Sequence, residues 1–261
     1  MGATSAYTAS LDGKISRRQL LLGGALALTV SCRRSHLPAA LRGAAASDLE
    51  PAFTELGAEF TRQTGRGVVF SFASSGSLAQ QLEHGAPFDL YASASTELVR
   101  RLAAHERLVA GSQRDFARGR LALWARAGVA VPQTLQELTR PGLGRIALAN
   151  PEHAPYGQAA VAALRKNGLY DALRPRLVFA ENVRQAFQFA QTGNADVALT
   201  ALTLARHGGA YIEIAESEHP PLVATLGVVR GGDERGAAQL ADFICSSAGQ
   251  AILRRHGFAA A

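Results

Sequence analysis

The sequence predicts an α/β protein in which helices cover both faces of a largely parallel sheet. Two observations support this fold class. From residue 37 onward, the spacing of apolar residues switches repeatedly between the period of a helix and that of a strand. Of the 261 residues, 48% are hydrophobic and 18% are charged, which is typical of a folded chain with a sizeable core. This length suits one large domain or two ordinary ones.

The first elements of the fold are a short strand and a long helix. Arg42 and Gly43 interrupt the apolar run that ends at residue 46, so we expect this strand to be short or kinked. The helix that follows carries apolar side chains spaced by four, three and four residues, and it ends near Gly65–Gly67. These side chains are Leu49, Phe53, Leu56 and Phe60.

Strands and helices then alternate to the end of the chain. Thr134 and Glu137 have the spacing of a capping box, which predicts a short helix there. Strands are predicted at 68–72, 87–91, 120–124, 145–149, 177–179, 197–200, 211–214 and 224–229. Helices are predicted at 78–82, 96–104, 157–166, 183–190, 236–244 and 248–255. Residues between 104 and 120 read as a polar link.

Residues 1–37 are predicted to be an export signal with a short tether. The twin arginines Arg17 and Arg18 precede an apolar run of about eleven residues, too short to cross a hydrocarbon core of ~30 Å. This arrangement resembles a twin-arginine signal. Residues 29–32 resemble a lipobox, so Cys32 is the expected lipidation site. We expect the mature protein in the periplasm or on the outer face of the cytoplasmic membrane, which it touches only through that lipid.

Composition and motifs exclude several functions. The net charge of +6 comes from scattered basic residues, without the clustering that nucleic-acid binding needs. The chain has no Gly-x4-Gly-Lys-Ser/Thr segment, so it is not a transporter ATPase. The seven histidines never pair at metal-ligand spacing. We therefore expect no cofactor and no nucleic-acid partner.

Four predicted helix starts share a design that suits an anion. Small or polar residues lead into each helix near Ser47, Ser75, Tyr156 and Val183. The first N–H groups of a helix have no partner within it, and the helix dipole favours a negative charge there. Serine hydroxyls add directional donors. The alternative for Ser47 or Ser75 alone is a helix N-cap, which needs no ligand.

Six segments resemble the periplasmic molybdate-binding proteins of ABC importers. They occur in that family's order and spacing between about residues 38 and 258. The segments are 44–47, 72–81, 85–94, 150–157, 181–184 and 254–258. The resemblance implies a two-lobed periplasmic-binding-protein fold (type II) with the ligand between the lobes. It implies crossings near 119–124 and 225–229, so that lobe one is 38–120 plus 229–261 and lobe two is 121–228.

The resemblance also implies the ligand contacts and the partners. Ser47, Ser75, Tyr156 and Val183 take the positions whose hydroxyls and N–H groups hold the oxyanion, and molybdenum is bound only as that oxyanion. Some members use a tyrosine at the place of Ala201, for which Tyr156 would substitute. No catalytic residue is implied. The expected protein is a monomer that captures molybdate or tungstate and delivers it to a membrane permease with its ATPase.

Three other functions remain open. The same fold could bind another oxyanion such as sulfate, which the sequence does not distinguish from molybdate. It could carry ferric iron, although the five tyrosines are dispersed at 7, 91, 156, 170 and 211, whereas ferric-binding relatives often present adjacent ones. It could be a serine hydrolase that pairs Ser75 with His153, although Gly-x-Ser-x-Gly is absent.

Overall fold

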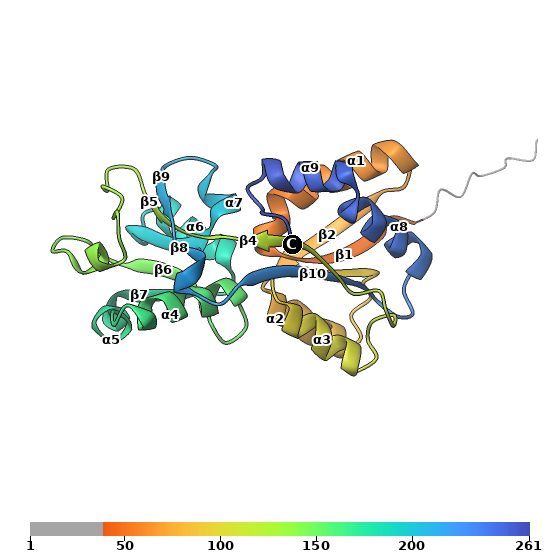
Figure 1. The fold of residues 1–261 in the computed structure, drawn as a ribbon, viewed down its shortest axis with the longest axis horizontal. Coiled ribbons are helices and arrows are strands. Elements are labelled where there is room, and N and C mark those ends of the chain that lie inside the picture. Colours follow the sequence, from red (N-terminus) through yellow and green to blue (C-terminus); the bar gives the residue numbers. More distant parts are fainter. Residues whose placement is uncertain (1–38) are drawn as a thin grey trace, which may run out of the picture. The chain divides into compact units, whose positions relative to one another are not determined.

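A computed structural model describes residues 39–261, and residues 38–261 form one compact unit (Figure 1). The predicted export signal, its twin arginines and Cys32 lie outside the described residues. The described chain forms two five-stranded sheets, which define two lobes. Among the described helices, none is long and apolar enough to cross a membrane.

The sheet of lobe one has the strand order β2-β1-β3-β10-β4. Its strands are β1 (Leu41–Ala46), β2 (Val68–Ala73), β3 (Leu90–Ser93), β4 (Arg114–Gly119) and β10 (Leu222–Val228). Strands β1, β2 and β3 are parallel, whereas β10 runs antiparallel to both β3 and β4. The sheet is therefore mixed, not largely parallel as expected, because apolar spacing carries no information on strand direction.

Helices cover both faces of this sheet, as Figure 1 shows. Helices α2 and α3 lie on one face, where they enclose a core that includes Leu78, Tyr91 and Leu102. Helices α1, α8 and α9 lie on the other face. Their bounds are α1 (Glu50–Thr64), α2 (Ser75–Glu83), α3 (Thr96–Ala104), α8 (Glu234–Cys245) and α9 (Ser247–Arg255). A short 3-10 turn, η1 (Ser47–Leu49), joins β1 to α1.

The sheet of lobe two repeats this plan with the order β7-β6-β8-β5-β9. Its strands are β5 (Leu121–Ala125), β6 (Ile146–Ala149), β7 (Leu177–Ala180), β8 (Val197–Ala201) and β9 (Ala210–Glu213). Helices α4 (Pro155–Lys166) and α6 (Val183–Gln191) cover opposite faces, and α5 (Tyr170–Leu173) and α7 (Leu202–Ala205) are single turns. Strand β5 is antiparallel to both of its neighbours. The 3-10 turns of this lobe are η2 (Gln136–Thr139), η3 (Arg174–Arg176) and η4 (Glu216–Glu218).

The chain passes between the two sheets twice. The first passage is at Arg120, between β4 and β5, and the second is the segment 214–221, between β9 and β10. Because all of β10 pairs with β3 and β4, the expected boundary at residue 228 is wrong: lobe two ends before Leu222. The apolar run of β10 is equally suited to either sheet, so its pattern alone did not reveal this earlier passage.

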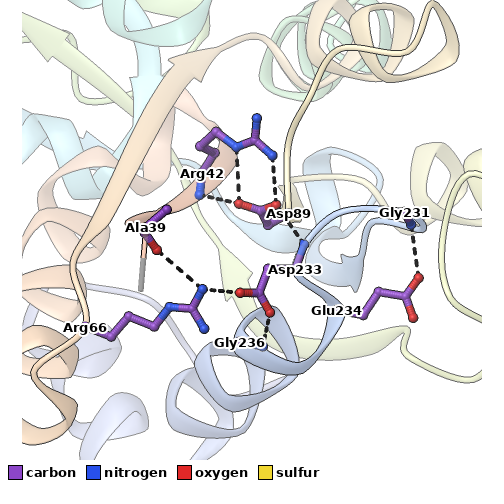
Figure 2. Close-up of polar contacts among 8 residues, drawn as sticks. All are labelled: Ala39, Arg42, Arg66, Asp89, Gly231, Asp233, Glu234 and Gly236. Atoms are coloured by element: carbon purple, nitrogen blue, oxygen red, sulfur yellow. Dashed lines mark hydrogen bonds and ion pairs between the residues drawn. The ribbon is translucent and has the colours of Figure 1, made fainter. Parts of the chain in front are cut away.

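Strand β1 is continuous, which corrects the expectation of a short or kinked strand. All six of its residues pair with β2. A Cβ at Gly43 would lie 2.3 Å from the Phe70 ring, so this glycine makes room for an aromatic side chain. Arg42 points outward to a carboxylate, Asp89, as Figure 2 shows. Both residues are therefore compatible with a strand here, because Gly43 packs against the Phe70 ring and Arg42 pairs with Asp89.

Asp89 links three segments of lobe one. Its carboxylate accepts from the Arg42 N–H at 2.7 Å, from the Arg42 guanidinium at 3.1 and 3.3 Å, and from the Asp233 N–H at 3.0 Å (Figure 2). Burial alone would raise the pKa of Asp89, but these hydrogen bonds outweigh it and lower that pKa. Asp233 caps α8 through the Gly236 N–H and pairs with Arg66. The start of α8 is thus tied to β1 and to the residue that precedes β3.

Two local predictions fail for identifiable reasons. Strand β4 lies in the segment predicted to be a polar link. It escapes prediction because it is an edge strand whose sequence, RDFARG, alternates poorly and carries three charges. The capping box at Thr134 does not form. The 3-10 turn there begins after Leu135 without a side-chain cap, and Glu137 accepts instead from the Gln133 N–H at 3.0 Å.

Candidate anion-binding site

The four residues predicted to bind the anion line one small cavity between the lobes. Lobe one contributes Ser47 and Ser75, and lobe two contributes Tyr156 and Val183. The cavity has a volume of about 10 Å³, enough for about one water molecule. The remaining lining residues are Ala46, Asp48, Ala73, Ser74, Ala94, Ala154 and Pro155. The lobes are therefore closed tightly around this cavity.

Ser47 is buried at the point where β1 turns into helix. It is the first residue of η1, which continues directly into α1. The residue in the N-cap position is Ala46, and no side chain caps this turn. The alternative reading of Ser47 as an N-cap is therefore wrong, and its buried hydroxyl lines the cavity.

Ser75 is likewise not a cap. The cap of α2 is the preceding Ser74, whose Oγ accepts from the Ser77 N–H at 3.2 Å. The Ser75 Oγ accepts from the Ala94 N–H at 3.1 Å, which fixes the hydroxyl and leaves its own hydrogen to be donated. Because Ser75 is 1% exposed and lines the cavity, that hydrogen is available to a ligand there.

Lobe two presents the starts of two helices to the cavity. Asn182 caps α6 by accepting from the Gln185 N–H at 3.0 Å, so Val183 is the first residue of the helix and its N–H has no partner within it. Tyr156 is the second residue of α4. A Cβ at Gly157 would lie 2.2 Å from the Ala149 carbonyl oxygen, so this glycine lets α4 start directly against β6.

A buried carboxyl, Asp48, meets the Tyr156 side chain across the lobes. Asp48 is 1% exposed and Tyr156 is 2% exposed. Within residues 39–261, neither the Asp48 Oδ2 nor the Tyr156 hydroxyl has a hydrogen-bond partner of good geometry. Burial raises the pKa of Asp48 to about 7, although its own N–H and the nearby Tyr156 hydroxyl lower it. Burial, followed by the charge of Asp48, raises the pKa of Tyr156.

Tyr156 reaches this place because Gly119 leaves room for it. A Cβ at Gly119, the last residue of β4, would lie 2.1 Å from the tyrosine hydroxyl oxygen. The position of Ala201, where some family members carry a tyrosine, is separate from the place that the Tyr156 hydroxyl occupies. Ala201 is fully buried, pairs with Leu121 at the end of β8 and does not line the cavity.

Direct hydrogen bonds join the lobes around the cavity. The Gly76 N–H donates to the His153 carbonyl at 2.8 Å, and the Thr203 hydroxyl donates to the Asp48 carbonyl at 2.9 Å. The His153 ring is hydrogen-bonded to the Ser74 hydroxyl at 2.9 Å. The Ser75–His153 pair that the hydrolase alternative required is therefore not formed, because the adjacent serine takes the histidine.

Among residues 39–261, no lysine or arginine lines the cavity. Within the same residues, Asp48 is the one lining side chain that can carry a charge near neutral pH. The nearby Arg184 is paired with Glu50 at 2.9 Å, and neither lines the cavity. Sequence reasoning missed Asp48 and Gly119. Asp48 follows Ser47 directly, so its position was visible, but its contact with Tyr156 across the lobes was not.

The described chain forms two lobes, each with a five-stranded mixed sheet, and passes between them twice. A small cavity lies between the lobes at their helix starts. These features define a two-lobed solute-binding protein. Residues 41–259 match the family described as bacterial extracellular solute-binding protein. The chain belongs to this family.

Named relatives agree with this assignment. The molybdate-binding protein ModA of Rhodobacter capsulatus is 33% identical over 247 residues, covering 92% of this chain and 97% of that protein. Among solved structures, the periplasmic molybdate-binding protein of Azotobacter vinelandii matches with a TM-score of 0.80 at 29% identity, covering 85% of this chain and 99% of that one. The sulfate-binding protein SubI of Mycobacterium tuberculosis shares the fold, with a TM-score of 0.70 at 16% identity over 85% of this chain and 86% of that one.

Proposed function

We propose that this protein captures molybdate, or the similar tungstate, outside the cytoplasm and delivers it to an ABC-type membrane permease with its ATPase. The observation that carries the proposal is the convergence of Ser47, Ser75, Tyr156 and Val183 on one closed cavity between the lobes. The names of the relatives in Rhodobacter capsulatus and Azotobacter vinelandii support molybdate as the cargo.

The proposed contacts are made to the oxygens of the anion. The Ser47 and Ser75 hydroxyls and the Val183 N–H are neutral donors, and Tyr156 adds a phenolic hydroxyl. The helices that begin at or next to these residues place their N-terminal ends at the cavity, where helix dipoles favour an anion without a buried cation. A tetrahedral dianion is larger than the single water that the cavity admits, so the lobes open to take it up and the lining shifts outward around it.

We propose a binding protein without catalysis. Two observations support this reading: the Ser75 hydroxyl accepts from a backbone N–H, and His153 is bonded to Ser74 instead. Two observations on residues 39–261 disfavour a ferric site: Tyr156 is their only tyrosine in the lining, and no three of their histidine, cysteine or acidic side chains gather to hold a metal ion.

Titration calorimetry with molybdate, tungstate, sulfate and phosphate tests the proposed cargo. We expect one anion per chain, with molybdate and tungstate bound at least tenfold more tightly than sulfate, which corresponds to about 1.4 kcal/mol or more. Molybdate and sulfate are both tetrahedral dianions, so a difference in their affinities reports how well the closed cavity fits the size of the anion. Tightest binding of sulfate would overturn molybdate as the cargo, and binding of none of the four anions would overturn the whole proposal.

A further inference from the structure

The candidate cavity combines two features that oppose each other. It is built to hold an anion with neutral donors, yet the one lining side chain that ionises near neutral pH is a carboxyl group, Asp48. An ionised carboxylate would repel an oxyanion a few ångströms away, and burial strengthens this repulsion because it lowers the local dielectric constant. A protonated carboxyl group would instead donate a hydrogen bond to the anion.

Within the described part of the chain, the surroundings of Asp48 supply no unpaired cation. On α4 the facing group is Tyr156, a hydroxyl that is neutral near pH 7. On α6 the nearest charged group is Arg184, which is paired with Glu50 of α1. The single turn α7 contains no ionisable side chain and contributes Thr203, which donates to the Asp48 carbonyl. The Asp48 Oδ2 is buried without a hydrogen-bond partner within the described residues, and Asp48 is one of the residues that line the cavity.

We propose that Asp48 binds the anion as a neutral carboxylic acid, so that each bound oxyanion shares the cavity with one proton held by this side chain. This inference rests on the proposed oxyanion function. The proton comes from solvent and is carried by the carboxyl group, which donates it in a hydrogen bond to an anion oxygen. A buried acid that stays neutral near pH 7 can serve as such a donor. The burial of Asp48 acts in this direction, since it raises the pKa to about 7 before any anion adds to the effect.

The expected pH dependence follows from the sign of this shift. Below about pH 6, the acid form is already present, and affinity is independent of pH. Above about pH 8, the free protein is ionised and must take up a proton to bind, so the dissociation constant rises by about tenfold per pH unit. Net proton uptake per anion therefore rises from near zero to near one across this range.

The test is calorimetric titration of molybdate at about pH 6 and about pH 8.5, each in two buffers of different ionisation enthalpy, which measures proton uptake directly. For the unaltered chain, we expect uptake near one proton per anion at the higher pH. Asp48→Asn keeps the shape of the side chain and a donor N–H, so it should bind with little proton uptake and little pH dependence. Asp242→Asn, at an exposed carboxyl remote from the cavity, is the matched control and should behave like the unaltered chain.

The outcomes separate the two proposals. Binding of molybdate by the unaltered chain without proton uptake at pH 8.5 would overturn the role of Asp48 and leave the oxyanion function standing. Equal pH slopes in the unaltered chain and Asp48→Asn would do the same. Tighter binding of hydrogen phosphate than molybdate, reversed in Asp48→Asn, would place the proton on the anion and also overturn the neutral acid. Failure of the unaltered chain to bind any oxyanion would overturn both proposals. The measurement on the unaltered chain decides the matter even if Asp48→Asn does not fold.

Discussion

The two lobes contribute different chemistry to the cavity. Lobe one supplies side-chain groups, namely the Ser47 and Ser75 hydroxyls and the Asp48 carboxyl. Lobe two supplies the Val183 N–H, which no substitution except proline removes, and the Tyr156 hydroxyl. Side-chain groups can be changed one atom at a time, whereas a backbone N–H is fixed by the position of its helix. Point substitutions can therefore measure the whole contribution of lobe one, but only the Tyr156 part of the contribution of lobe two.

Two glycines, one in each lobe, lie against backbone atoms for different reasons. Gly76 of lobe one approaches the His153 backbone of lobe two, and its Cβ would lie 2.6 Å from that carbonyl oxygen. Gly157 approaches the Ala149 carbonyl within lobe two itself. Both positions exclude a Cβ, but only the first exclusion depends on the lobes being closed. One glycine therefore serves closure, and the other serves the fold of a single lobe.

The largest effect is expected from Gly76→Ala. The obstructing atoms belong to backbone and cannot rotate away, so the closed state should lose up to about 3 kcal/mol, or roughly a hundredfold in molybdate affinity. The melting midpoint of the ligand-free protein should not fall, because the open state has no such clash. Gly157→Ala is the control: it should lower that midpoint. A lowered midpoint for Gly76→Ala with unchanged affinity would break the distinction between the two glycines.

The next effect is expected from Ser47→Ala and Ser75→Ala. Each removes a neutral donor to a dianion, worth about 1.5–3 kcal/mol, or roughly ten- to a hundredfold in calorimetric affinity. Neither serine caps a helix, so Ser47→Ala should change the free energy of unfolding little. Ser75→Ala should lower it by about 1–3 kcal/mol, because the buried Ala94 N–H loses its acceptor. Ser246→Ala is the matched control because Ser246 caps α9 through the Gly249 N–H. It should cost about 1 kcal/mol of stability and leave affinity unchanged. The reverse pattern would contradict the assignment of the cavity serines.

Tyr156→Phe tests the side-chain contribution of lobe two. The substitution removes only the hydroxyl, which faces Asp48 and the space above Gly119. We expect a loss of about 0.5–1.5 kcal/mol, or roughly two- to tenfold in affinity. Because that hydroxyl has no well-formed hydrogen bond among the described residues, the ligand-free protein should be equally or more stable by chemical denaturation. A marked loss of stability without loss of affinity would make Tyr156 a structural residue.

The smallest effect concerns Asp89, far from the ligand. Its folded pKa lies below the ordinary value, so it stabilises the folded protein above that ordinary value and loses this contribution as the pH falls through the folded pKa. The free energy of unfolding should therefore decrease below about pH 4. The Asp89→Asn variant should lack this decrease when its free energy of unfolding is measured by urea titration at several acidic pH values. An unchanged acid profile would show that other carboxyl groups dominate.

The sequence predicted most helices and strands, but it predicted few of the contacts between them. Helix α1 was recognisable because Phe53, Leu56 and Phe60 repeat at helical spacing and are buried on one face. The helix starts at Ser75 and Val183 were recognisable from the caps and small residues before them. Among the features of the sequence, only the family resemblance indicated molybdate as the ligand.

The remaining features depend on contacts that local patterns do not encode. Edge strand β4 is too polar to stand out, and the direction of β10 is set by its pairing partners. The contact between Asp48 and Tyr156 joins two lobes across a closed cavity, so it depends on tertiary structure alone. Spacing can predict where a helix begins, but it cannot predict what faces that helix from the other lobe.

The most direct test of the account is a crystal structure of the protein grown with molybdate, with the metal located by its anomalous scattering. We predict a single molybdenum position between the lobes. Its oxygens should lie about 2.7–3.2 Å from the Ser47 and Ser75 hydroxyls and the Val183 N–H, the ordinary range for hydrogen bonds. A molybdenum position outside this cavity, or an oxyanion held there by a lysine or arginine side chain, would contradict the account.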